Sequence, residues 1–246
     1  MVAGEYFRRG FAEFVGVFVL VFVAAGERAF ASVPTDLALA YGLAVAVMVT
    51  ATAAISGGHI NPAVTLGFVI TRRIQPLVAV WYWIAQFGGA ALAALLLKWV
   101  LPHTAQSQGH LGVPVLGTGV SAGKGVVVEA VLTFFLVWVV FATIVDARSA
   151  FEQVAGLAIG LTVVFNVLMA YGLTGAAMNP ARAFGPQLVG DHWAHCWVWY
   201  VGPFAGAVIA AALYEMLYLR PGQDELVVVE AAAVVVEPLD DEATPS

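Results

Sequence analysis

Charged residues are scarce in this chain. Asp, Glu, Lys and Arg make up 11% of its 246 residues and hydrophobic residues 61%, whereas a soluble domain has about 25% charged residues. The acids are also unevenly spread, with a dense group after residue 223. This composition excludes an ordinary soluble domain and predicts an integral membrane protein surrounded by a lipid bilayer.

Cysteine and basic clusters are nearly absent. The single Cys196 excludes an intrachain disulfide framework, and without a basic patch nucleic-acid binding is not indicated. The spacing of His192, His195 and Cys196 could hold a soft metal, but an ordinary loop is the simpler interpretation because no fourth ligand accompanies them. We therefore expect no metal site and no cofactor. An enzyme is disfavoured, because no nucleophile–base pair lies near the motifs described below.

Long hydrophobic runs are abundant. About 20 apolar residues cross a bilayer as a helix, and six runs reach that length: 11–29, 37–55, 76–100, 126–145, 154–171 and 197–219. Two shorter apolar pieces, 62–70 and 180–189, follow the second and fifth runs. At about 1.5 Å per residue each is roughly 14 Å long, or half of the hydrocarbon thickness. The runs predict an all-α membrane protein with six transmembrane helices and two re-entrant half-helices.

The basic residues predict the orientation. Six spans place both termini on one side, and the larger group of basic loop residues falls there. That group is Arg8, Arg9, Arg72, Arg73, Arg148 and Arg220, against Arg28, Lys98 and Lys124 on the other side. Because cytoplasmic loops carry the excess of Lys and Arg, we expect both termini in the cytoplasm and the protein in the cell (plasma) membrane.

The two halves of the chain repeat. Glu13 in the first span is matched by Glu129 in the fourth, and Asn61 is matched by Asn179, 118 residues later. Three spans per repeat is an odd number, so the halves have opposite orientations, and such inverted repeats place a site at their interface near the midplane. The expected segments are a cytoplasmic N-terminus 1–7, repeats 8–110 and 124–220, an outer connector 111–123 and an acidic, disordered cytoplasmic tail 221–246.

One tripeptide occurs twice, as Asn61-Pro62-Ala63 and as Asn179-Pro180-Ala181. Asn is a favoured N-cap and Pro suits the first helical position, so each copy starts a half-helix at membrane depth. A helix start there is tolerated only where its free backbone groups are buried in protein or line a cavity. Capping through the side-chain oxygens leaves the amide N–H donors for the lumen. The alternative is that the asparagines only cap their helices.

These features resemble the aquaporin (major intrinsic protein) family. The likeness covers about residues 8–220 and is carried by the two Asn-Pro-Ala motifs, by Arg182 directly after the second, and by Glu13 and Glu129. The neighbouring residues Ser56-Gly57-Gly58-His59-Ile60 and Ala183-Phe184-Gly185-Pro186 add to it. The resemblance implies an inverted 3+3 repeat, right-handed bundles assembled as a homotetramer, and one pore in each protomer.

The resemblance also implies a selectivity filter, located by counting from the motifs: Tyr41, Val167, Ala176 and Arg182. Water-selective members have His at the position of Val167, and glycerol facilitators have Asp where this chain has Ala183. The filter is therefore expected to be wider and less polar on one wall than in strict water channels. Arg182 is expected to bind permeant oxygen and repel cations, the alternative being a packing salt bridge with Glu129.

Glu13 and Glu129 are acids inside apolar spans. Their carboxylates are expected to accept hydrogen bonds from N–H groups of the re-entrant loops, and His59 is expected to brace its loop. The alternative is a proton relay, which is weaker because spans two, three and five carry no acid.

The predicted function is a passive channel for water that also passes some small uncharged solutes and excludes protons and ions. Three alternatives remain open. A glycerol facilitator would differ in solute swelling assays. A coupled secondary transporter would need a titratable residue where the midplane offers asparagines. A structural junction protein with a closed pore would show no robust permeability.

Overall fold

The computed structural model describes residues 3–30, 33–108 and 110–220, so the tail predicted at 221–246 lies outside the described residues. Within these ranges six helices are long and apolar enough to cross a membrane, and no strand is present. They are α1 (Ala3–Phe30), α2 (Pro34–Ser56), α4 (Pro76–Val100), α6 (Ala122–Val140), α7 (Ala155–Thr174) and α9 (Val198–Tyr214). The predicted all-α membrane fold is confirmed.

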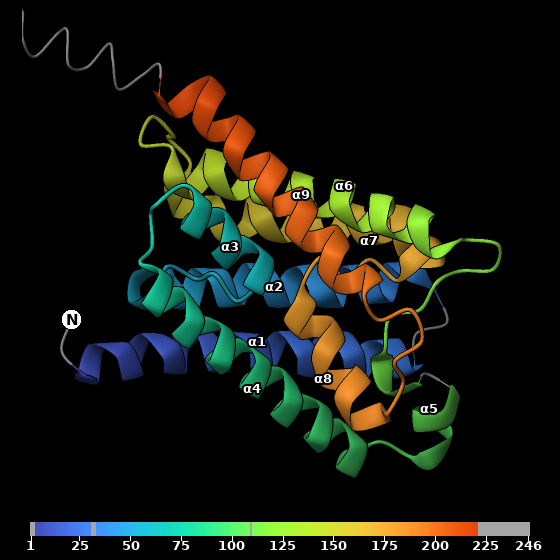
Figure 1. Ribbon diagram of the computed structural model, residues 1–246. Coiled ribbons are helices and arrows are strands. Elements are labelled where there is room, and N and C mark those ends of the chain that lie inside the picture. The colour runs from blue at the N-terminus through green and yellow to red at the C-terminus, as the bar shows by residue number, and fades with distance from the viewer. Residues whose placement is uncertain (1–2, 31–32, 109, 221–246) are drawn as a thin grey trace, which may run out of the picture.

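Two short helices lie among the long ones (Figure 1). They are α3 (Pro62–Ile70) and α8 (Pro180–Gly190). Both begin near the centre of the molecule and run in opposite directions, α3 toward the end that carries the N-terminus and α8 toward the end that carries α5 (His103–Gln108). These are the two half-helices that the short apolar pieces predict.

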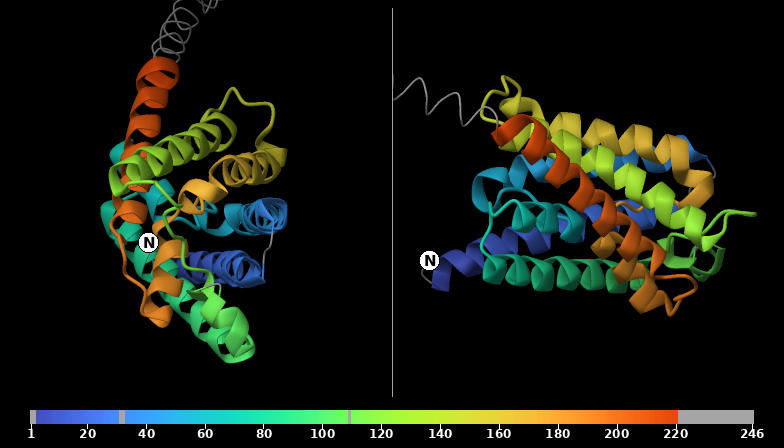
Figure 2. Two further views of the ribbon diagram at one scale, coloured as in Figure 1. Left: turned by 90° about the vertical axis from the view of Figure 1, so that its right-hand side faces the viewer. Right: turned by 45° about the horizontal axis from the view of Figure 1, so that its top comes forward.

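The helices pair in a way that repeats between the halves. α1 packs on α4 in the first half and α6 packs on α9 in the second, while α2 packs on α7 across the junction. Each half-helix contacts the last long helix of the other half, α3 against α9 and α8 against α4. The right-hand panel of Figure 2 shows the long helices side by side with the half-helices among them. The repeat in the sequence is therefore also a repeat in packing.

Glycine allows the central crossing of α2 and α7. A Cβ atom on Gly42 would lie 2.6 Å from the carbonyl oxygen of Gly160, and a Cβ atom on Gly160 would meet the carbonyl oxygen of Gly42. Neither position tolerates a side chain without separating the helices. Small residues bring backbones together in this way in membrane bundles, where the hydrophobic effect does not drive helices together.

The structure departs from the expected spans at their ends. α1 begins at residue 3 rather than 11, because Glu5 and Arg9 form an ion pair of 2.8 Å one helical turn apart. α6 and α9 each continue into a π-helical turn, η2 (Phe141–Val145) and η4 (Glu215–Leu219). The connecting segments contain α5 and two short 3₁₀ turns, η1 (His110–Gly112) and η3 (Glu152–Val154). Sequence analysis did not predict these three short elements, because their sequences show no apolar periodicity.

Candidate pore

The two asparagines start the two half-helices. Asn61 is the N-cap of α3, and its Oδ1 accepts a hydrogen bond of 2.8 Å from the backbone N–H of Ala63. Asn179 caps α8 in the same way, accepting from Ala181 at 3.0 Å and from Arg182 at 3.3 Å. Pro62 and Pro180 follow directly at the first helical positions. Both motifs thus satisfy free N–H groups of a helix start at membrane depth.

The two caps are also bonded to each other's loops. Nδ2 of Asn61 donates to the carbonyl oxygen of Met178 at 2.9 Å, and Nδ2 of Asn179 donates to that of Ile60 at 2.9 Å. Each side-chain amide carries two hydrogens. The expectation that both N–H donors of each amide face the lumen is therefore wrong for one of them. One hydrogen of each amide bonds to a carbonyl oxygen of the opposite half, and only the other is left for the lumen.

The accepting carbonyls come from strained backbone. Ile60 has φ 40° and Met178 has φ 53°, in the left-handed region that branched and bulky residues rarely adopt. Such strain persists only where the surroundings over-determine it. At both positions the surroundings are a buried carboxylate on the N–H side and the opposite asparagine on the C=O side.

Glu13 of α1 accepts hydrogen bonds from the first re-entrant loop. Its carboxylate accepts from the hydroxyl of Ser56 at 2.6 Å and from the backbone N–H groups of His59 at 3.0 Å and Ile60 at 2.6 Å. The amide of Gln86 donates to it at 2.8 Å. Glu13 is completely buried, and these four donors offset the cost of that burial.

Glu129 of α6 accepts hydrogen bonds from the second re-entrant loop in the same arrangement. Its carboxylate accepts from the hydroxyl of Thr174 at 2.6 Å and from the N–H groups of Ala177 at 3.0 Å and Met178 at 2.7 Å. It too is completely buried. Each of these donors lies 118 residues after its counterpart in the first loop. Both carboxylates therefore bind loop N–H groups that the helices leave unpaired.

His59 lies beside the first motif. One ring nitrogen, Nδ1, is 3.1 Å from the hydroxyl oxygen of Thr65, and the ring centroid is 4.3 Å from that of Phe68. The side chain is 5% exposed and also lines the central cavity. The structure thus places His59 both against α3 and at the lumen.

Tyr41, Val167, Ala176 and Arg182, the residues predicted to form the filter, are all buried. Tyr41 of α2 donates its hydroxyl to the carbonyl oxygen of Ala177 at 2.6 Å, beside Ala176. Val167 of α7 and Ala176 are fully buried in the same apolar cluster as Tyr41.

Arg182 is fully buried one turn into α8. Its Nη1 donates to the carbonyl oxygen of Gly112 in the connector at 2.8 Å. Within the described residues its Nε and Nη2 have no hydrogen-bond partner and it forms no ion pair. The salt bridge with Glu129 that sequence analysis left open is therefore not formed, and the N–H groups of two guanidinium nitrogens, Nε and Nη2, have no partner among the described residues.

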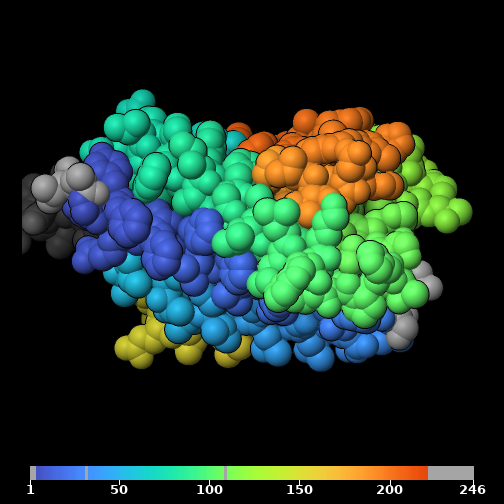
Figure 3. Space-filling view, turned by 90° about the horizontal axis from the view of Figure 1, so that it is seen from below, coloured from blue at the N-terminus to red at the C-terminus, as the bar shows by residue number. Residues whose placement is uncertain are grey.

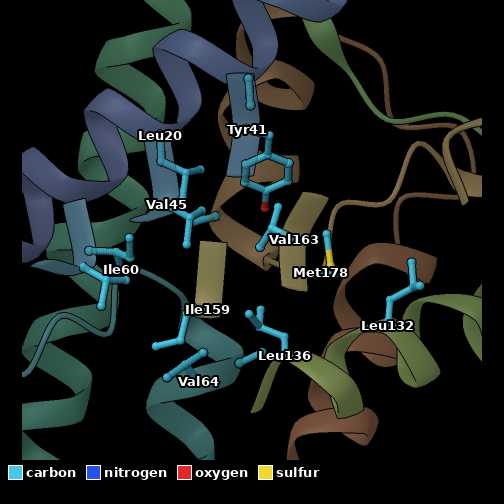
Figure 4. Packing of buried hydrophobic residues seen from close by; sticks show 14 of the residues in the cluster. Leu20, Tyr41, Val45, Ile60, Val64, Leu132, Leu136, Ile159, Val163 and Met178 are labelled. Carbon is cyan, nitrogen blue, oxygen red and sulfur yellow. The ribbon is translucent and has the colours of Figure 1, made fainter. Parts of the chain in front are cut away.

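A small cavity lies beside the two motifs. About 20 Å³ is open to the centre of a water-sized sphere, which is room for about one water molecule. Asn61, Asn179 and His59 line it together with Tyr41, and aliphatic side chains complete the wall. Figure 4 shows that wall, with Leu20, Val45, Ile60, Val64, Leu136, Ile159 and Val163 around the space. Few polar groups line an otherwise apolar passage.

Several residues of the site escaped sequence analysis. Tyr82 donates to the carbonyl oxygen of Ser56 at 2.6 Å, and Trp199 donates to that of Thr174 at 3.1 Å, so the ends of α2 and α7 are held alike. The offset of 118 residues would have paired Ser56 with Thr174, and an offset of 117 would have paired Tyr82 with Trp199. Nothing in the sequence indicates the contact between Gly112 and Arg182.

The fold and the paired motifs define a polytopic membrane protein with a central passage built by two inverted halves. Residues 2–214 match the model of the major intrinsic protein family, and the chain belongs to that family.

Known relatives agree over most of the chain. Aquaporin TIP4-4 of Zea mays is 48% identical over 193 residues, which is 78% of this chain and 74% of the relative. Probable aquaporin TIP3-2 of Arabidopsis thaliana is 40% identical over 229 residues, 86% and 84% of the two chains. Aquaporin-4 of Mus musculus is 40% identical over 215 residues, 84% of this chain and 66% of the relative.

A solved structure supports the fold. The X-ray structure of the aquaglyceroporin from Plasmodium falciparum superimposes with a TM-score of 0.77, at 23% identity, over 89% of this chain and 99% of that chain. At this identity the likeness shows the fold alone.

Proposed function

We propose that this chain is a passive channel for water that also passes some small uncharged solutes and excludes protons and ions. The reciprocal bonds from Asn61 to Met178 and from Asn179 to Ile60 carry the proposal. They hold two half-helices with their N-terminal ends toward each other, and each asparagine retains one amide hydrogen for the lumen. The aquaporin relatives support the same assignment.

This arrangement selects against charge at the centre. Helix N-termini carry partial positive charge, so two of them facing one passage oppose hydronium and other cations. A water molecule there accepts from the asparagine donors through its oxygen, which turns its hydrogens away toward its neighbours. Donor-lined, dipole-flanked pores discriminate by these two effects. Pro62, Ala63, Pro180 and Ala181 contribute by fixing the helix starts from which the field arises.

We assign the filter to Tyr41, Val167, Ala176 and Arg182. Arg182 supplies the free N–H groups of Nε and Nη2 and a positive charge, while Val167 and Ala176 supply an apolar wall. The hydroxyl hydrogen of Tyr41 is directed to Ala177, so Tyr41 adds little donor capacity of its own. Glu13, Glu129 and His59 support the loops. The apolar wall favours some passage of small neutral solutes, which makes a glycerol facilitator the second candidate.

The membrane, topology and assembly of the channel are part of the same proposal. We propose a multi-pass plasma membrane protein with cytoplasmic termini, with repeats 8–110 and 124–220 joined by the outer connector 111–123, and assembled as a homotetramer in the lipid bilayer. Residues 221–246 would form its cytoplasmic tail. The basic residues of the loops support the orientation, and family membership supports the assembly.

Parallel stopped-flow measurement of water, glycerol, urea and ammonia flux in proteoliposomes tests this proposal. We expect fast water flux, slower flux of the small neutral solutes, and no flux of ions. Glycerol flux that matches or exceeds water flux would favour the facilitator. Flux of every solute at the rate of protein-free liposomes would remove the channel assignment.

A further inference from the structure

Arg28 lies in the last turn of α1, next to the outer connector. Its Nε donates to the carbonyl oxygen of Val113 at 3.2 Å. Its guanidinium carbon lies 5.1 Å from the ring centroid of Tyr171 on α7, a cation–π contact. One arginine of the first half thus contacts both the connector and a helix of the second half.

The filter arginine holds the neighbouring peptide. Arg182 donates to the carbonyl oxygen of Gly112 at 2.8 Å, and Gly112 directly precedes Val113. Two arginines from different halves of the chain therefore bind consecutive carbonyls of one backbone segment. The turn η1, which contains Gly112, packs against both α1 and α8, and in Figure 3 the green surface of the part of the chain around α5 borders the orange surface that contains α8.

That backbone segment is strained. His110 and Leu111 have φ of 45° and 53°, which residues other than glycine rarely adopt, whereas Gly112 takes its φ of 79° without strain. Strain of this kind persists only where neighbours over-determine it. Two contacts hold it here. The side chain of Leu111 is buried, at 3% exposure, and Gly112 packs so closely on α1 that a Cβ atom would meet the backbone of Ala25. Ala25 lies one turn before Arg28, so the end of α1 seats the connector.

Arg28 also contacts the second re-entrant loop. A Cβ added to Gly175 would lie 3.2 Å from Nη1 of Arg28, so the guanidinium packs directly against this glycine. Gly175 has φ 76° and is followed by the filter residue Ala176. The two backbone segments on either side of the filter, 112–113 and 175–176, are therefore both in contact with one side chain.

We infer that Arg28 is a positioning residue for the pore filter: by holding the connector at Val113, it fixes the Gly112 carbonyl that orients Arg182. The inference rests on the proposed function, since it concerns which solutes the filter admits. Without Arg28 the connector keeps its strain but loses a hydrogen bond to a charged group. The Gly112 carbonyl then moves, Arg182 is held less well, and the filter widens.

The test compares Arg28→Met with wild-type protein in proteoliposomes, with the ratio of urea permeability to water permeability as the readout. We expect the ratio to rise by about tenfold, the population change that accompanies loss of one hydrogen bond to a charged group. Arg9→Met is the matched control, because Arg9 lies on the same helix at the opposite end and pairs with Glu5. Its ratio should equal that of the wild type.

The ratio separates positioning from general damage, because a merely structural role would lower both permeabilities together. Arg28→Lys provides a second variant if Arg28→Met does not assemble; it keeps the charge, lacks Nε, and should raise the ratio less. Normal water flux with an unchanged ratio in the tested variant would overturn this inference alone. Wild-type protein that passes no water would overturn the proposed function and this inference with it.

Discussion

Asn61 donates a hydrogen bond of 2.9 Å to the carbonyl oxygen of Met178, 117 residues away in the chain. Asn179 returns an equal bond to Ile60. Each asparagine thus caps its own half-helix with an oxygen and fixes the opposite loop with a nitrogen. The two motifs form one unit, and a change in either should disturb both half-helices.

Asn61→Ala should lower both the melting temperature of the detergent-solubilised protein and water flux per protein. The substitution removes a cap, at about 1 kcal/mol, and leaves the Met178 carbonyl without its amide donor, at about 1–3 kcal/mol. Asn179→Ala should cost a similar amount, and the double variant less than the sum, because the bonds belong to one network. Gln75→Ala is the control, since Gln75 is an N-cap without a side-chain cap bond. Fully additive losses would contradict the coupling.

Arg182→Val should increase the passage of cations and of larger neutral solutes relative to water. The substitution removes the positive charge of the filter and leaves an aliphatic side chain in a wider opening. Conductance and urea flux, each measured with water flux in the same vesicles, provide the check. Arg148→Val, on the segment after η2, is the control. Unchanged selectivity in Arg182→Val would remove Arg182 from the filter.

Val167→His should reduce the ratios of glycerol and urea permeability to water permeability. Histidine adds bulk and a polar group to the apolar wall of the filter. Leu168→Ile, at the next residue of the same helix, changes a side chain that is exposed on the surface of the bundle and serves as the comparison. Solute ratios that do not respond to Val167→His would show that Val167 is not at the filter.

Glu13→Gln should destabilise the protein while leaving proton exclusion intact. The carboxylate accepts four hydrogen bonds, and a glutamine turns an NH₂ group toward donors. Each mismatched donor costs about 1–3 kcal/mol, so the melting temperature should fall markedly. Glu5→Gln is the control on the same helix, because its partly exposed ion pair is worth only about 0–1 kcal/mol. Proton flux through the wild-type protein that Glu13→Gln abolishes would instead support the proton relay.

The sequence predicts the fold and the centre of the site well, because both depend on local signals that occur twice. Long apolar runs specify the spanning helices, and Asn followed by Pro specifies each helix start. The roles of Glu13 and Glu129 follow from the cost of burying an acid, and their contacts with the loop N–H groups agree with that reasoning.

The outer part of the site depends on contacts between distant segments, which a single sequence does not display. Gly112 reaches Arg182 from 70 residues away through a carbonyl group that every residue type possesses. Among the residues that the structure describes, Arg28 has no acid partner that would mark it as more than a loop cation. The hydrogen bonds from each asparagine to the opposite loop could not be predicted either, since the capping role alone does not show where the amide hydrogens point.

Osmotic water permeability measured together with proton flux, in the same proteoliposomes and over a range of temperatures, tests the central claim most directly. The account predicts fast shrinkage, a weaker temperature dependence than in protein-free vesicles, and proton flux no higher than theirs. Water flux at the lipid rate, or proton flux that rises in step with water flux, would contradict it.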